Sequence, residues 1–196
     1  MAIVYLSLGT NLGDRAHNLE RAVARLAEVL DTLVLSPVYE TDPWGLVDQP
    51  DFYNLCARGE TTLEPRALLR LLKRLERALG RVDGTLWGPR LIDIDLLFYD
   101  DLVLDEPALQ VPHPRIRSRA FVLIPLLDLV EDLQHPALDC SIRSLASEVD
   151  ATTVRRLAQP LTGASPLAHA LSCANQARYR ETPPGSPRSP RARHRA

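Results

Sequence analysis

The chain has 196 residues, of which 45% are hydrophobic and 24% are charged, with a formal net charge of −2. This composition is typical of a soluble globular protein, and it gives no reason to expect binding to nucleic acid or to a membrane. An odd number of widely spaced cysteines argues against a disulfide framework, and there is neither a signal peptide nor a membrane-length apolar run, so we expect a cytoplasmic protein.

The first part of the chain reads as three strands and one helix. A β-prone apolar run predicts a strand at Ala2–Leu8, and Asp14 is a suitable N-cap for the amphipathic helix that follows. Further strands are expected at Thr32–Tyr39 and Phe52–Thr61. Proline and glycine between them predict a loop at 42–50.

The clearest helix lies in the stretch that ends at Gly80. Thr61 with Glu64 resembles a capping box, leucines recur at helical spacing, and Gly80 is a natural stop. A loop at 81–89 then leads into an apolar strand at Leu91–Tyr99.

The later elements are shorter. Ser118 can cap a helix over Ala120–Leu129, although Pro125 limits the length of that helix. A short strand at 102–104 and a helix near Ile142–Val149 are also predicted.

The order strand, helix, strand, strand, helix, strand predicts a ferredoxin-like α+β fold, with a mainly antiparallel sheet and helices packed on it. We expect one domain at 1–160, followed by a Pro- and Arg-rich extension at 161–196 with the composition of a disordered segment.

Asp93 and Asp95 lie two residues apart inside the apolar strand. Side chains at i and i+2 share one face of a strand, so both carboxylates point the same way, about 7 Å apart at their bases. Like charges at that spacing repel each other unless cations lie between them, and carboxylate oxygens are ligands that Mg²⁺ prefers. Strict alternation would place Ile92, Ile94, Leu96 and Phe98 in the core, and Leu97 and Tyr99 on the aspartate face.

Basic side chains flank this pair in the sequence. Arg81 and Arg90 precede it, and His113 and Arg119 follow it. Arginine suits bidentate phosphate binding, and carboxylates among cations are what a nucleoside triphosphate with two divalent metals requires. The alternative is a solvated, charged sheet face, which is the more common setting for so short an Asp-X-Asp motif.

Five stretches resemble, in their order and spacing, the 6-hydroxymethyl-7,8-dihydropterin pyrophosphokinases of folate biosynthesis. They are LGTNLGD (8–14), YETDPWGLVDQPDFYN (39–54), LERALGR (75–81), WGPRLIDIDLLFY (87–99) and VPHPRIRSRAFVLIPL (111–126). The resemblance covers about residues 1–160, while 161–196 fall outside it.

The resemblance implies transfer of the β,γ-pyrophosphoryl group of ATP to the pterin hydroxymethyl oxygen, with release of AMP. It implies that Asp93 and Asp95 hold two Mg²⁺ ions and that Arg81 and Arg90 act in catalysis. ATP and the pterin are the expected partners, and neither a membrane nor nucleic acid is.

The resemblance also assigns the remaining site residues. Phe52 and Phe121 would sandwich the pterin ring, since a flat heteroaromatic is well held between two aromatic faces. Its edge would be recognised by Thr41, Pro43, Trp44 and Asn54. The nucleotide environment would consist of Glu76, Trp87, Arg90, His113 and Arg119.

Simpler roles stay open for these residues: core packing for the two phenylalanines, turn formation for Asn54 and a helix-face charge for Glu76. Asp83 also departs from the family pattern, which has a basic residue there, and the loop to Trp87 looks short.

Two other functions stay open as alternatives to the pyrophosphokinase. A two-metal nucleotidyltransferase also uses Asp-X-Asp on a strand, although its Gly-Ser signature is absent, and a ferredoxin-like domain could bind a metabolite without catalysis.

Overall fold

The computed structural model describes residues 1–46, 48–82 and 88–158. Three predictions from the sequence lie outside these residues: the role of Trp87, the effect of Asp83 and the extension at 161–196.

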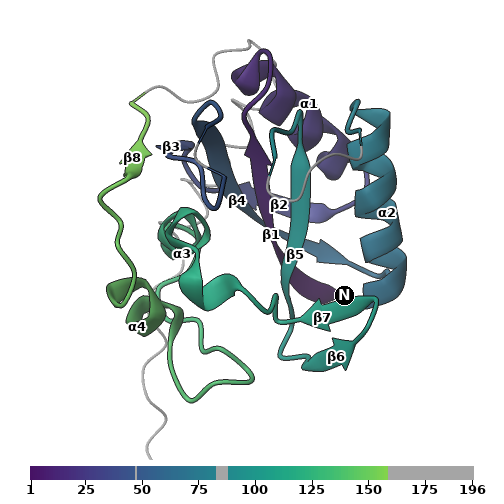
Figure 1. The fold of residues 1–196 in the computed structure, drawn as a ribbon. Helices are drawn as coiled ribbons and strands as arrows, with labels where there is room; N and C mark the ends of the chain where they lie inside the picture. Colours follow the sequence, from purple (N-terminus) through teal and green to yellow (C-terminus); the bar gives the residue numbers. More distant parts are fainter. Residues whose placement is uncertain (47, 83–87, 159–196) are drawn as a thin grey trace, which may run out of the picture.

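A six-stranded antiparallel sheet forms the centre of the molecule (Figure 1). Strand β1 lies in the middle, antiparallel to β4 on one side and to β5 on the other. The order is β5-β1-β4-β3-β8, with β2 also pairing with β4. The bounds are β1 Ala2–Thr10, β2 Asp31–Leu35, β3 Tyr39–Thr41, β4 Phe52–Thr61, β5 Asp93–Tyr99 and β8 Val154–Arg156. This arrangement confirms the ferredoxin-like α+β fold.

Helices cover both faces of the sheet (Figure 1). Helices α1 (Arg15–Ala27) and α2 (Pro65–Ala78) pack on one face. The other face carries η1 (Ile116–Ser118), α3 (Ala120–Leu127) and α4 (Ile142–Ser147). A two-stranded ribbon of β6 (Leu104–Glu106) and β7 (Leu109–Val111) connects β5 to η1. None of the helices in the described residues is long and apolar enough to cross a membrane.

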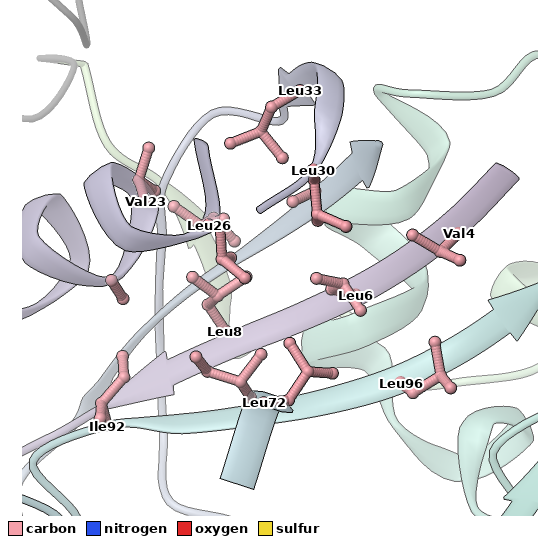
Figure 2. Packing of buried hydrophobic residues seen from close by; sticks show 14 of the residues in the cluster. Val4, Leu6, Leu8, Val23, Leu26, Leu30, Leu33, Leu72, Ile92 and Leu96 are labelled. Atoms are coloured by element: carbon pink, nitrogen blue, oxygen red, sulfur yellow. The ribbon is translucent and has the colours of Figure 1, made fainter. Parts of the chain in front are cut away.

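The larger core lies between the sheet and the pair α1 and α2 (Figure 2). Leu6 and Leu8 of β1 meet Leu26 of α1 and Leu72 of α2, and all four are completely buried. Each side chain of this kind contributes roughly 1.5–3 kcal/mol through burial. The second core is smaller and joins Phe98 to α3 and α4.

The helix ends agree only in part with those predicted from the sequence. Asp14 caps α1 as predicted, since its carboxylate accepts a hydrogen bond from the His17 N–H at 3.0 Å. Gly80 ends α2 with φ of +99°, a conformation that glycine adopts without a Cβ clash. The capping box is wrong: Glu64 makes no side-chain cap bond, and Thr61 is still part of β4. Arg119, and not Ser118, precedes α3, without a side-chain cap.

Two strand predictions also need correction. The run predicted at Thr32–Tyr39 is two strands, because the chain leaves the sheet at 36–38 around a proline. In β5 a bulge follows Leu96, so that Tyr5 pairs with Phe98 while Leu6 pairs with Leu96. The bulge turns Phe98 into the second core and Tyr99 toward the first, the reverse of what strict alternation predicts.

Candidate active site

A cavity that is partly open to solvent, with an empty volume of about 590 Å³ in which that solvent space is included, lies at the end of the sheet where β1 and β4 meet the start of β5. The strands contribute Ser7, Gly9, Thr41, Phe52, Asn54, Asp93 and Asp95, and the loops and the start of α3 contribute Asp42, Trp44, Gly88, Arg90, Arg119 and Phe121.

The sheet register brings the strand residues together. Gly9 of β1 is paired with Asn54 of β4 on one side and with Asp93 of β5 on the other. Ser7 is paired with Asp95, two residues before Gly9 in β1 and two residues after Asp93 in β5. Because alternate residues of a strand share a face, the amide of Asn54 and the carboxylates of Asp93 and Asp95 point into the cavity from the same face of the sheet.

The half of the cavity nearer β3 and β4 is lined mainly by uncharged side chains, with Asp42 as the exception, and we call Thr41, Phe52, Asn54 and Phe121 the neutral half. Asn54 is 3% exposed, and its amide NH₂ donates to the Thr41 hydroxyl at 2.7 Å. Its carbonyl oxygen lies against Gly9, where an added Cβ would approach it to 2.7 Å. The asparagine is therefore held in one orientation before any ligand arrives.

The other half is charged. We call Lys73, Glu76, Arg81, Arg90, Asp93, Asp95 and Arg119 the charged cluster. Asp93 is paired with Arg81 at 2.5 Å and with Arg90. Asp95 is paired with Arg119 at 3.1 Å. The protein's own arginines thus offset the repulsion between the aspartates, and the metal ions that the sequence reasoning favoured for this place stay a prediction.

Glu76 supports this cluster through contacts of its buried carboxylate. The side chain is buried, and one of its oxygens accepts from the backbone N–H of Ile94 at 2.6 Å, between the two aspartates. The same oxygen accepts from the Lys73 ammonium at 2.8 Å, and the other oxygen lies 2.6 Å from the Arg81 guanidinium. Each carboxylate oxygen therefore has a protein partner.

Ionisation in the cluster reflects burial working against ion pairing. Burial alone would raise the pKa of Asp93, but Arg90 and Arg81 outweigh it and hold that pKa below its usual value. Burial raises the pKa of Glu76, although Lys73 opposes this. The Arg81 pKa is raised: desolvation opposes the shift, and Asp93 and Glu76 overcome it.

His113 stands beside the cluster as a neutral ring. Burial lowers the pKa of His113, and Asp95 only partly opposes this. Its Nδ1 accepts from the Arg115 N–H at 3.1 Å, and Nη1 of Arg119 lies 3.5 Å from its Nε2. The same Nε2 lies 3.8 Å from Asp95.

Arg119 reaches from the start of α3 across the cavity. Its guanidinium carbon lies 5.5 Å from the centre of the Phe121 ring and 5.8 Å from that of Trp44. Its Nε is buried without a hydrogen-bond partner among the described residues. A buried N–H with no acceptor is rare, so this one calls for an acceptor beyond the described residues.

Asn11 connects the loops on the two sides of the cavity. Its side-chain oxygen accepts from the Arg90 N–H at 2.7 Å. Its NH₂ donates to the Gln49 side chain and to the Pro50 carbonyl, both at 3.0 Å. One buried residue thus fixes the loop before β5 against the loop that carries Trp44.

The structure brings together most of the residues that the resemblance assigned. Those lining the cavity are Thr41, Trp44, Phe52, Asn54, Arg90, Asp93, Asp95, Arg119 and Phe121. Pro43 lies beside Trp44 but does not line it, and Glu76, Arg81 and His113 stand behind the lining residues. Sequence reasoning missed Ser7, Gly9, Asn11 and Lys73. Of these, Gly9 and Asn11 lie within the LGTNLGD motif, which carried the resemblance without any role for either residue.

Comparison with known proteins identifies the class. The 7,8-dihydro-6-hydroxymethylpterin-pyrophosphokinase (HPPK) family matches residues 5–131. A 2-amino-4-hydroxy-6-hydroxymethyldihydropteridine pyrophosphokinase of Aquifex aeolicus is 42% identical over 136 residues, which is 69% of this chain and 85% of that protein. The enzyme of the same name from Methylorubrum extorquens is 43% identical over 135 residues, 68% of this chain and 85% of that protein.

The chain therefore belongs to the HPPK family, and this membership confirms the family and the enzyme class predicted from the sequence. Membership implies ATP as co-substrate and a pterin as substrate.

Solved structures agree in fold. A chain described as HPPK-DHPS in complex with substrates has a TM-score of 0.62 and 16% identity, covering 74% of this chain and 43% of that one. At this identity the likeness concerns the fold alone. This chain spans less than half of that bifunctional chain, and only 20% of the Folic acid synthesis protein fol1 of Pneumocystis carinii, to which it is 41% identical over 147 residues (74% of this chain).

Proposed function

We propose that this chain transfers the pyrophosphoryl group of ATP to the hydroxymethyl oxygen of 6-hydroxymethyl-7,8-dihydropterin, releasing AMP. The observation that carries the proposal is a single cavity with a neutral half beside a charged cluster. The neutral half suits a flat heteroaromatic ring and the charged cluster suits a polyphosphate. The hydroxymethyl group and the transferred phosphoryl group would meet where Gly9 separates Asn54 from Asp93.

The neutral half would hold the pterin. Phe52 and Phe121 come from different elements and line the same cavity, where a ring inserted between them would gain stacking worth about 0.5–1.5 kcal/mol per contact beyond area burial. Asn54 offers the donor and acceptor that a lactam edge needs, and Thr41 and Gly9 hold it in place.

The charged cluster would bind the nucleotide phosphates. Arg90 and Arg119 line the cavity with planar guanidinium groups, which match phosphate geometry. The unpartnered Nε of Arg119 supplies a buried donor for a phosphate oxygen. His113 would add an imidazole ring on the same side. Glu76 would act as a positioning residue, since its oxygens are taken by protein donors.

Asp93 and Asp95 fit the divalent metals that the reaction needs. In the described residues no group of three or more His, Cys, Asp or Glu side chains could hold a metal ion. A site of two carboxylates fits Mg²⁺, which is usually bound through one or two carboxylates with phosphate oxygens and water as the remaining ligands. Bound there, two Mg²⁺ ions would neutralise charge on the transferring phosphoryl groups.

The catalytic unit would extend past the end of the family match at residue 131. Strand β8 pairs with β3 beside Thr41, and Arg155 of β8 binds Asp42 at 2.9 Å and Asp51 at 3.1 Å, at the two ends of the loop that carries Trp44. We therefore propose a domain that ends near residue 160.

The buried Cys56 thiol is free, which fits a reducing compartment such as the cytoplasm.

Product analysis tests the proposed reaction. The protein is incubated with ATP, Mg²⁺ and 6-hydroxymethyl-7,8-dihydropterin, and nucleotide and pterin products are identified by mass spectrometry. We expect AMP and a pterin diphosphate in equal amounts. A nucleotidyl adduct with free pyrophosphate would assign the chain to nucleotidyl transfer, and tight pterin binding without turnover would leave only a metabolite-binding role.

A further inference from the structure

Lys73 is the only lysine of the chain and occupies a position that the proposed reaction does not use. It projects from α2 to the edge of β5, where its ammonium donates to the Glu76 carboxylate at 2.8 Å and to the Ile94 carbonyl at 3.2 Å. From there the nitrogen lies 3.9 Å from Oδ1 of Asp93 and 3.8 Å from Oδ1 of Asp95. It is nearly equidistant from the two aspartates.

The arginines are placed differently. Arg90 and Arg81 pair with Asp93 alone among the aspartates, and Arg119 with Asp95 alone. Within the described residues Lys73 is the cation whose ion pairs reach both carboxylates. A compact ammonium between two carboxylates occupies the kind of position that a bridging cation takes.

Ion pairs within the protein offset all but one of the charges of the cluster before any ligand binds. Four cationic side chains, Lys73, Arg81, Arg90 and Arg119, surround three carboxylates, Glu76, Asp93 and Asp95, which leaves one net positive charge. Two Mg²⁺ ions alone would add four positive charges to this cluster. Two Mg²⁺ ions together with ATP carrying four negative charges would leave its net charge unchanged.

We propose that Lys73 is a resident cation of the metal site, which holds the two aspartates together in the free protein and opposes Mg²⁺ binding until nucleotide is present. The proposal rests on the metal site assigned above. Lys73 keeps its shorter contacts to Glu76 and Ile94 when a metal binds, and loses only the two longer ones to the aspartates. It is a positioning residue that sets how strongly the aspartates bind a metal.

Calorimetric titration of the full chain with MgCl₂, in the absence of nucleotide, tests this role. Lys73→Met removes the charge and keeps an unbranched chain, so we expect Mg²⁺ to bind about tenfold more tightly than to the parent, since a unit charge near 4 Å interacts strongly at a partly buried site. Lys73→Arg retains the charge and should keep the weak binding of the parent. Arg74→Met, on the exposed side of the same helix, is the matched control and should change nothing.

The variants separate this proposal from the metal site itself. Asp95→Asn should abolish Mg²⁺ binding to the nucleotide-free protein, and if it does not, the metal site assignment fails. If Asp95→Asn abolishes binding while Lys73→Met binds Mg²⁺ as weakly as the parent, the metal site stands and the resident cation is refuted.

A second measurement protects against a folding defect in the methionine variant. Selective ¹³C-lysine labelling of the parent gives one set of side-chain signals, because the chain has one lysine. Mg²⁺ with the ATP analogue should shift the signal of the carbon next to the ammonium as its neighbours exchange. In Asp95→Asn the same addition should shift it far less. An unmoved signal in the parent under saturating ligand would overturn the proposal.

Discussion

The two halves of the cavity are prepared for their ligands in different ways. The neutral half depends on one hydrogen bond and one steric contact, those that hold Asn54 against Thr41 and Gly9. The charged cluster depends on ion pairs that already compensate one another. The neutral half is therefore preformed, and its affinity for a ligand changes with each contact that is gained or lost. In the charged cluster, by our proposal, metal and nucleotide together replace contacts that the protein's own ions make with one another.

The largest expected effect is loss of turnover when an aspartate loses its charge. Asp93→Asn and Asp95→Asn should each lower kcat/KM by on the order of 10³-fold or more, because electrostatic stabilisation of the transferring group is usually the largest catalytic contribution. AMP release measures this. Near-parent rates in both variants would show that the aspartates are not the metal site.

Thermal unfolding of the same variants without metal sharpens the comparison. Asp93→Asn leaves Arg90 without its carboxylate and Arg81 with Glu76 alone, and it should lower the free energy of unfolding by roughly 2–3 kcal/mol. Asp95→Asn removes fewer contacts and should cost less. Equal or greater stability of Asp93→Asn would show that repulsion between the aspartates outweighs their arginine pairing.

Gly9→Ala should break the neutral half and leave the charged cluster intact. The new Cβ would lie 2.7 Å from the Asn54 oxygen, so the amide must turn away from its bond to Thr41. We expect pterin binding to weaken about tenfold to a hundredfold, from the usual 1–3 kcal/mol cost of overpacking. Calorimetry with the pterin measures this, and unchanged binding of the ATP analogue serves as the internal control. Equal weakening of both ligands would mean that the two halves are one unit.

Phe121→Ala should have a smaller effect on the same half. Loss of one stacking face should weaken pterin binding several-fold, from about 0.5–1.5 kcal/mol beyond area burial. Affinity for the ATP analogue should stay nearly unchanged. If unfolding experiments show instead a general loss of stability with no selective effect on the pterin, Phe121 belongs to the second core and not to the site.

The smallest effect concerns a histidine outside the cavity. His135 packs edge-on against Phe98 with ring centres 5.6 Å apart, and burial lowers its pKa. A lowered folded-state pKa means that the unfolded chain binds the proton more readily, so stability is complete above about pH 6.5 and falls as pH drops below it. Thermal unfolding across pH should show that His135→Gln reduces this slope. An unchanged slope would assign the pH dependence to other groups.

The sequence predicts the sheet and the cavity residues well where a pattern is both local and strong. The strand at Leu91–Tyr99 and the paired aspartates are visible because apolar and acidic residues alternate there. The bulge after Leu96 is not visible in the sequence, since it depends on how β1 and β5 meet. It reverses the faces that strict alternation predicts for Phe98 and Tyr99.

Other features depend on contacts between distant segments. Lys73 and Glu76 look like an ordinary pair on a helix face, and only the packing of α2 against the edge of β5 brings them to the aspartates. Strand β8 was not predicted, because three residues at a sheet edge carry too little pattern to be recognised. Asn11 reads as a turn residue until both loops that it binds are in place.

The claim that the charged cluster accepts metal and nucleotide only together is tested most directly by thermal unfolding of the parent under four conditions. These are no ligand, MgCl₂ alone, a non-hydrolysable ATP analogue alone, and both. The account predicts that the rise in midpoint temperature with both ligands exceeds the sum of the two separate rises, because only the combination leaves the cluster charge unchanged. A full rise with MgCl₂ alone would contradict it, since the aspartates would then be an open metal site that the protein's own cations do not occupy.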